Sequence, residues 1–385
     1  MIIGKKRDPK EVDDARKREV ESSVPLGIEI AGAWAWRILA LAGVAVVFGL
    51  LVIQLNLIVV PFMIAVLVAA LLVPVVQFLV RHRWPKGLAV AVTMIVTLGV
   101  LTGLIVLIVT QIRSGIPDLQ DRSVAAYEDF KEFLRTTWNI NDTEFNDYLE
   151  QGWAAIQTDS QALVSGALSV GSTAGHVLTG ALLTLFATLF ILIDGHGIWN
   201  WMVRLFPRKA RPAVDGSGRA GWLTLTTFVK VQFFVAAVDA TGIGLGAFIL
   251  GLFFGGFPLV IPIAVAVFLG SFIPVVGAVV TGAIAIFVAL IYLGPIPALI
   301  MLGIVLLVQQ VEGHILQPLV MGSAVKIHPL AVVFAVAAGS FIAGIPGALF
   351  AVPVVAVLNV MVTYVASGRW RAQVRPQIED VATSV

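Results

Sequence analysis

A stretch of 72 residues, from Ala240 to Val311, contains no Asp, Glu, Lys, Arg or His. A transmembrane helix needs about 20 apolar residues, so this stretch alone is long enough for about three crossings of a bilayer. The rest of the chain agrees, because 59% of its 385 residues are apolar, 12% are charged and the mean hydropathy is +0.98. The sequence therefore predicts an all-α polytopic membrane protein.

Charge placement along the chain predicts the orientation of the spans. Basic segments, among them RHRWPKG at 81–87 and the stretch 204–230, are typical of cytoplasmic loops. The polar segment 113–165 carries ten acidic and four basic residues and is expected on the outside. Its aromatic and aliphatic residues repeat at helical spacing, which predicts a small extracytoplasmic helical insertion. Both termini are then expected in the cytoplasm.

The expected architecture has about eight transmembrane helices, with broken or re-entrant segments toward the C-terminus. Prolines divide the region after residue 256 into pieces of varied length, so hydropathy alone does not separate eight crossings with re-entrant pieces from ten short crossings. The chain is interpreted in six parts: 1–33, a charged cytoplasmic tail; 34–112, three N-terminal transmembrane helices; 113–165, the extracytoplasmic amphipathic segment; 166–230, the fourth transmembrane helix and a basic cytoplasmic segment; 231–367, the C-terminal region with broken helices; and 368–385, a cytoplasmic tail.

Two breaks in the C-terminal region have nearly the same letters, GSFIPVVGA at 270–278 and GSFIAGIPGA at 339–348. A proline frees a backbone carbonyl and a glycine admits close approach, and in lipid such groups are tolerated only when buried in protein or facing a water-filled cavity. Secondary transporters build substrate sites from paired broken helices, so the breaks are candidates for a polar lining, although common membrane residues also recur by chance. The backbone positions that shape the breaks are Gly270, Pro274, Gly277, Pro318, Gly344, Pro346 and Gly347.

Residue content argues against several other chemistries. The chain has no cysteine, and its five histidines show no HxxxH or HExxH spacing that would place two metal ligands on one helix face. It contains neither GxxxxGKS nor GxxxxGKT, so it has no P-loop for ATP. An intramembrane hydrolase would need a nucleophile next to a base, which the sequence does not show. We therefore predict that the protein is not an enzyme and has no cofactor, no metal and no nucleic-acid partner.

The C-terminal half resembles a known family. QQVEGHILQPLVMG at 309–322, followed by HPL at 328–330 and GIPGALFAVP at 344–353, resembles the C-terminal signature of the autoinducer-2 exporter family, the AI-2E transporters. LFPRKAR and FLGSFIPVVGAV resemble the middle of the same family. An Asn often occupies the turn after the family's Glu, whereas Gly313 and His314 follow Glu312 here, and this difference leaves the chemistry of the turn open.

The resemblance implies a bacterial inner-membrane protein that exports a small polar solute, autoinducer-2 or a similar molecule. Some relatives are described as sodium/proton antiporters, so cation/proton exchange is the alternative function. The resemblance also implies a homo-oligomer, a pentamer in the family, with an elevator-like movement of the C-terminal part. The expected partners are the small solute and membrane lipid.

A passive channel or a structural scaffold is a further alternative function. Neither would need charged groups within its spans.

Two acidic residues within the spans are the first candidates for solute binding or ion coupling, because ionisable groups in a membrane are costly and usually face a cavity. Glu312 lies in the family motif beside amides that can bind a hydroxylated ligand; the alternative is an interfacial carboxylate that pairs with Lys326 or Arg369. Asp239 is either a proton or sodium acceptor or a structural carboxyl that bonds to Thr241. The candidate set is Glu312, Asp239, Gln309, Gln310, Gln317, Ser271 and Ser340.

Overall fold

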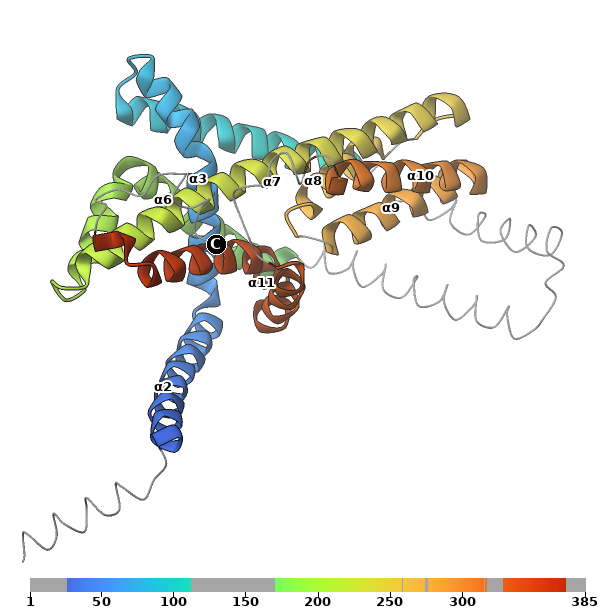
Figure 1. Ribbon diagram of the computed structural model, residues 1–385. Coiled ribbons are helices and arrows are strands. Elements are labelled where there is room, and N and C mark those ends of the chain that lie inside the picture. Colours follow the sequence, from blue (N-terminus) through green and yellow to red (C-terminus); the bar gives the residue numbers. More distant parts are fainter. Residues whose placement is uncertain are drawn as a thin grey trace, which may run out of the picture. The chain divides into compact units, whose positions relative to one another are not determined.

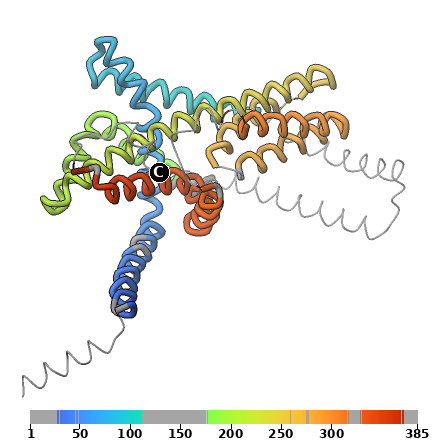
Figure 2. Tube along the Cα trace, in the orientation of Figure 1, coloured from blue at the N-terminus to red at the C-terminus, as the bar shows by residue number. Residues whose placement is uncertain are grey.

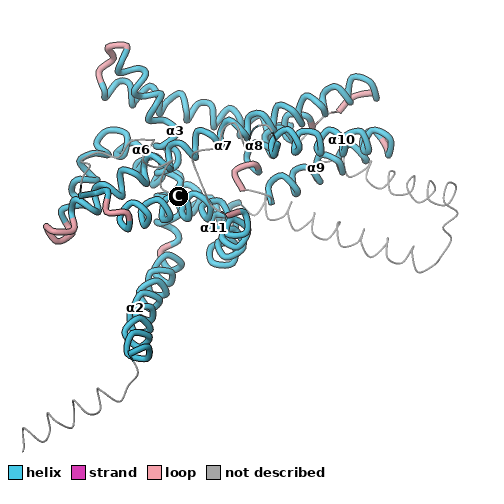
Figure 3. The backbone as a smooth tube through the Cα atoms, viewed as in Figure 1, coloured by secondary structure: helices cyan, strands magenta, loops and turns pink. Residues whose placement is uncertain are grey.

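The computed structural model of the chain describes residues 26–111, 170–257, 259–273, 276–314, 316 and 328–371. Within these ranges the chain forms helices joined by short loops and has no strand (Figure 3). The extracytoplasmic insertion expected at 113–165 lies outside them, as do most of the tails expected at 1–33 and 368–385. The all-α expectation is confirmed for the part of the chain that the structure describes.

Seven of the described helices are long and apolar enough to cross a membrane, which confirms a polytopic membrane protein. Two more, α8 and α9, are apolar but shorter. The helices are α2 (Leu26–Gln54), α3 (Asn56–Arg81), the helix Lys86–Gln111, α6 (Val170–Arg204), α7 (Arg211–Phe254), α8 (Val260–Gly270), α9 (Val276–Leu293), α10 (Pro295–Val311) and α11 (Pro329–Ala366), followed by the short 3-10 helix η2 (Arg369–Arg371).

α2 belongs to a compact unit of its own that ends at Asn56, and the chain from Leu57 onward forms a second unit. The helix begins at Leu26, inside the range 1–33 that the sequence interpretation assigned to a tail. The run LGIEIAGAWAW is apolar apart from Glu29, so it continues the apolar helix toward the N-terminus.

α7 is the longest described helix, with 44 residues, or about 66 Å at 1.5 Å per residue. It has a proline in its first turn and ends where Gly255 adopts a φ of 100°, a left-handed conformation that glycine takes without a steric penalty. The helix passes without interruption through residue 230, where the sequence suggested a change from a basic segment to a span. A single rod therefore connects the basic residues near Arg211 to the uncharged stretch after Asp239.

α8 and α9 run antiparallel and form a helical hairpin, called the first hairpin below. α8 has 11 residues, about 16 Å, which is roughly half of a hydrocarbon core. The two helices approach so closely that a β-carbon on Gly277 would overlap the Gly270 carbonyl, and one on Gly270 would overlap the Thr281 side chain. Farther from the tip, buried residues of both helices lie in one cluster. The break at 270–277 is thus a reversal of chain direction.

α11 contains a second reversal, visible as a sharp bend in Figures 1 and 2. The backbone leaves helical geometry at Ala343 and at Gly344, where φ is 62° and ψ is −143°, a region that favours glycine. The arms on either side, 329–342 and 345–366, form the second hairpin. A β-carbon on Gly347 would overlap the Gly339 carbonyl, and one on Gly339 would overlap the Gly347 carbonyl. Each copy of the repeated sequence therefore closes a hairpin through two glycines.

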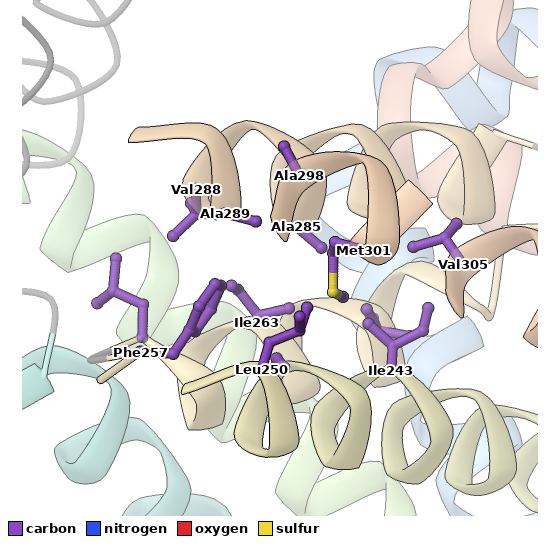
Figure 4. Close-up of a cluster of buried hydrophobic side chains, with 13 residues drawn as sticks. Ile243, Leu250, Phe257, Ile263, Ala285, Val288, Ala289, Ala298, Met301 and Val305 are labelled. Atoms are coloured by element: carbon purple, nitrogen blue, oxygen red, sulfur yellow. The ribbon is translucent and has the colours of Figure 1, made fainter. Parts of the chain in front are cut away.

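Three buried clusters hold the second unit together. The first joins α7, the first hairpin and α10, and Figure 4 shows Met301 of α10 pointing toward Ile243 and Leu250 of α7. The second joins α3, α7 and the second hairpin, and Ile273 at the tip of the first hairpin packs against it. The third joins α3, the helix Lys86–Gln111 and α6. The two hairpins consequently meet along α7.

Candidate functional site

Asp239 lies on α7 and is the one carboxylate that is buried among the described residues, with a side chain only 2% exposed. Its Oδ2 accepts a hydrogen bond from Ser271 Oγ, 3.1 Å away in the tip of the first hairpin. Its Oδ1 is also buried and has no hydrogen-bond partner within the described ranges. A buried carboxylate oxygen without a partner costs free energy. Binding of a proton, a cation or a solute hydroxyl to Asp239 Oδ1 would offset that cost.

Ser271 connects Asp239 to the end of α8. Its Oγ lies 2.8 Å from the carbonyl oxygen of Val267 and 3.1 Å from Asp239 Oδ2. A hydroxyl has one proton, so it donates to one of these oxygens at a time. When Asp239 carries a proton, its O–H donates to Ser271 Oγ while Ser271 donates to Val267, and both contacts are satisfied. When Asp239 has lost the proton, the two oxygens compete for the single Ser271 donor.

Gln232 fixes the backbone of the same tip, and the sequence analysis did not identify it. Its Nε2 donates to the carbonyl oxygen of Ser271 at 2.5 Å, and its side chain is 5% exposed. Gln232 lies seven residues before Asp239, two helical turns, which places both side chains on one face of α7. The spacing of seven residues between Gln232 and Asp239, two polar residues in an apolar helix, is the sequence signal that could have identified Gln232. Gln232 and Asp239 together hold the Ser271 main chain and side chain.

Glu312 lies at the C-terminal end of α10, half-buried, where the helix passes into π-helical turns. α10 packs antiparallel on α7: Ile304 lies over Gly246, and Val308 lies over Gly242, one turn earlier on α7. If this register continues by one α-helical turn, it predicts that Glu312 lies near the level of Val238 and its neighbour Asp239.

The remaining polar candidates and two of the prolines in the breaks separate into three groups. Gln309 is half-buried and Gln310 is exposed on the last turns of α10. Ser340 is exposed in the second hairpin and donates to the Val336 carbonyl oxygen of its own helix, at 2.8 Å. Gln317, Pro318 and Pro274 lie outside the described residues.

Thr241 is not the hydrogen-bond partner of Asp239 that the structural alternative required. Its Oγ1 donates to the Ala237 carbonyl oxygen at 2.6 Å, and the side chain is exposed. The hydrogen-bond partner of Asp239 is instead Ser271, which is 32 residues away along the chain.

A cavity of about 600 Å³ lies away from these groups, between the helix Lys86–Gln111 and α6. Its walls are formed by hydrocarbon side chains such as Met94, Leu98 and Phe186. A polar solute would lose its hydrogen bonds with water there and find one polar side chain, Thr179, so this cavity does not suit one.

The chain is similar to known transport proteins. The model of the family described as "AI-2E family transporter" matches residues 39–367. A Mycobacterium tuberculosis protein, "Putative transport protein MT0215", is 37% identical over 366 residues, which cover 95% of this chain and 98% of the relative. The Escherichia coli "AI-2 transport protein TqsA" is 24% identical over 329 residues, which cover 81% of this chain and 87% of the relative. The family match includes both hairpins.

Proposed function

Because the chain belongs to the AI-2E transporter family, we propose that it is a secondary transporter that exports a small polar solute, with Asp239 as the group that couples movement to a proton. The observation that carries this proposal is the buried Asp239 carboxylate and its contact with Ser271 at the tip of a hairpin. Ionisable groups at membrane depth are costly and mark ion pathways and proton relays. The hairpin tip is the part of the fold that responds directly to the charge of Asp239.

The hydrogen-bond choice at Ser271 supplies the coupling step. With Asp239 protonated, Ser271 donates to the Val267 carbonyl and completes the last turn of α8. After the proton leaves, the carboxylate competes for the Ser271 hydroxyl, and this last turn loses its side-chain support. Gln232 keeps the tip on α7 in both states through the Ser271 carbonyl. Protonation thus shifts the balance between two arrangements of the first hairpin.

The solute is proposed to be autoinducer-2 or a molecule of the same chemical class, a small compound with several hydroxyl groups. The Escherichia coli relative named as an AI-2 transport protein supports this choice. Glu312, expected near the level of Asp239, and Gln309 offer acceptors and donors for such hydroxyls, as the register of α10 on α7 indicates. The expected location is the bacterial inner membrane, with both termini in the cytoplasm.

Cation/proton exchange is the second candidate function. The Asp239 carboxylate favours it, because its Oδ1 has no partner among the described residues, and a carboxylate and the Ser271 hydroxyl at its Oδ2 are oxygen ligands of the kind that hard cations prefer. In this version the cation and the proton compete for Asp239, and the exchange moves no organic solute.

Inverted membrane vesicles with the wild-type protein, Asp239→Asn or Asp194→Asn separate these possibilities. Asp194→Asn is the matched control because Asp194 is exposed and asparagine retains its capping role. We expect labelled autoinducer-2 to accumulate under a pH gradient in the wild type and the control, and to fail to accumulate in Asp239→Asn. Sodium-driven proton movement without autoinducer-2 uptake in the wild type selects the antiporter. An unchanged response to the gradient in folded Asp239→Asn contradicts the coupling role.

A further inference from the structure

α6 bends at Asp194, and its last turns form a separate short helix, residues 195–204. Asp194 leaves helical geometry, with φ −139° and ψ 41°, and its Oδ1 accepts a hydrogen bond from the Gly197 N–H at 3.1 Å. This contact is the N-cap of the new helix. The span before the bend, counted from Val177, is about 26 Å long, close to the thickness of a hydrocarbon core. The bend therefore falls near a membrane surface.

The short helix presents an exposed apolar face. Ile198, Trp201, Met202 and Leu205 follow the i, i+3, i+4, i+7 spacing of one helical face. Trp201 is 63% exposed and Leu205 is 66% exposed, and no described part of the chain covers them. A tryptophan and a leucine on one face of a helix at this depth are typical of helices that lie in the lipid headgroup region.

The opposite face of the short helix is fixed to α7. The Trp199 ring lies where a β-carbon of residue 218 would be, so Gly218 makes the contact possible. Trp199 Nε1 donates to Asp215 Oδ1 at 2.8 Å, and Asp215 also pairs with Arg219 at 2.9 Å. Val203 is buried on the same side. The exposed face is thus held in place by the fold.

Basic residues follow the apolar face along the chain. Arg204, Arg208 and Lys209 are exposed, and no described acidic residue pairs with any of them. Arg211 has a different task, because its guanidinium donates to the carbonyl oxygens of Phe206 and Arg204 and closes the turn after the helix. Three cations therefore remain to face an anion outside the protein.

We propose that segment 195–209 is a binding surface for an anionic phospholipid. The apolar face lies at the boundary between headgroups and acyl chains, and the three cations contact the lipid phosphates. Each Lys or Arg near an anionic surface adds an attraction that a zwitterionic lipid does not supply. Because Trp199 joins this segment to Asp215 and Gly218 of α7, a lipid bound here is attached to the helix that carries Asp239.

Lipid titration of the purified full-length protein, read by native mass spectrometry, tests the preference for anionic lipid. We expect the wild type to retain phosphatidylglycerol over phosphatidylcholine, and the triple variant Arg204→Gln, Arg208→Gln, Lys209→Gln to bind phosphatidylglycerol roughly tenfold more weakly or worse. The matched control is Arg81→Gln, Arg83→Gln, Lys86→Gln, which removes the same charge from another exposed loop. A smaller loss in the control supports the proposal. Equal losses in the two triples, or no preference in the wild type, overturn it.

The depth of the apolar face is a second test, and it uses the absence of cysteine from the chain. Spin labels are attached to Leu205→Cys and, as the control, to Lys209→Cys in phosphatidylglycerol vesicles. We expect the Leu205→Cys label to be reached by oxygen from the bilayer and shielded from a water-soluble nickel complex, and the Lys209→Cys label to be reached by the nickel complex. Equal access of the nickel complex to both labels contradicts the proposal. Neither lipid test depends on transport, so each can fail while the proposed function stands.

Discussion

The two hairpins share the letters GSFI and a contact between two glycines, yet they have different surroundings. In the first hairpin, Ser271 is 9% exposed and contacts the buried Asp239. In the second, Ser340 is exposed and bonds to its own helix, and its neighbours Phe341 and Ile345 are 94% and 77% exposed. The repeated letters therefore determine the chain reversal, whereas the chemistry at each tip depends on what the adjacent helix presents.

The largest effect is expected where the hairpins are alike. Gly277→Val and Gly347→Val each place carbon atoms where a carbonyl of the facing arm lies, so each should destabilise the protein by about 3 kcal/mol or more. The measurement is thermal unfolding in detergent with recovery of folded protein. Gly303→Val is the control, since no atom outside its own helix lies near this position, and it should unfold close to the wild type. A well-tolerated Gly347→Val would show that the second hairpin does not close as the first does.

The serine pair sharpens the difference between the tips. Ser271→Ala removes the donor to Asp239 and leaves a buried carboxyl without its described partner, so the expected loss of stability is about 1–3 kcal/mol. Ser340→Ala removes a bond within one exposed helix turn and should stay within about 0.5 kcal/mol of the wild type. Chemical or thermal denaturation of the two variants, side by side, is the measurement. Equal losses would remove the distinction between the hairpins.

Gln232 should matter less than Ser271, because its loss affects a neutral carbonyl. Gln232→Leu leaves the Ser271 carbonyl oxygen without its side-chain donor, at an expected cost of about 1 kcal/mol. The control is Gln310→Leu, which changes an exposed amide on α10 and should have almost no effect. The comparison is made by the unfolding midpoint of both variants. A Gln310→Leu effect as large as that of Gln232→Leu would argue against the tip contact.

The smallest effect is expected at Thr241. Its hydroxyl donates to a carbonyl of its own helix and is exposed, so Thr241→Val should change stability by less than about 0.5 kcal/mol and leave proton coupling intact. Unfolding and proton flux are measured together for this variant. A loss of coupling in Thr241→Val would mean that Asp239 uses Thr241 in another arrangement of the site.

Local sequence patterns predicted the helices and the breaks because both depend on residues close together along the chain. Apolar runs predicted the spans, and the glycines and prolines of the repeated segments predicted two breaks, which the structure shows to be reversals of chain direction. The contacts at Asp239 were not predictable in this way, since Ser271 is 32 residues from Asp239 and 39 from Gln232, and no local periodicity connects them. The expected level of Glu312 on α7 likewise follows from the packing of Val308 on Gly242.

The kink at Asp194 also shows that local sequence patterns do not predict contacts between separate helices. The sequence interpretation treated 166–230 as a span followed by a basic segment, although Ile198, Trp201, Met202 and Leu205 stand at helical spacing within it. The anchoring of this short helix does not follow from local spacing, because it requires Trp199 to meet Asp215 and Gly218 on α7. Packing on α7 buries the side of the short helix that carries Trp199 and Val203, and it leaves the side with Trp201 and Leu205 exposed.

Proton movement through reconstituted vesicles tests the central claim most directly, with a pH-sensitive dye inside and either autoinducer-2 or sodium as the driving gradient. The wild type and Ser340→Ala should move protons at comparable rates, Ser271→Ala should be slower, and Asp239→Asn should show no flux above protein-free vesicles. Flux in folded Asp239→Asn equal to that of the wild type would contradict the account, because the buried carboxylate at the tip of the first hairpin would then carry no proton.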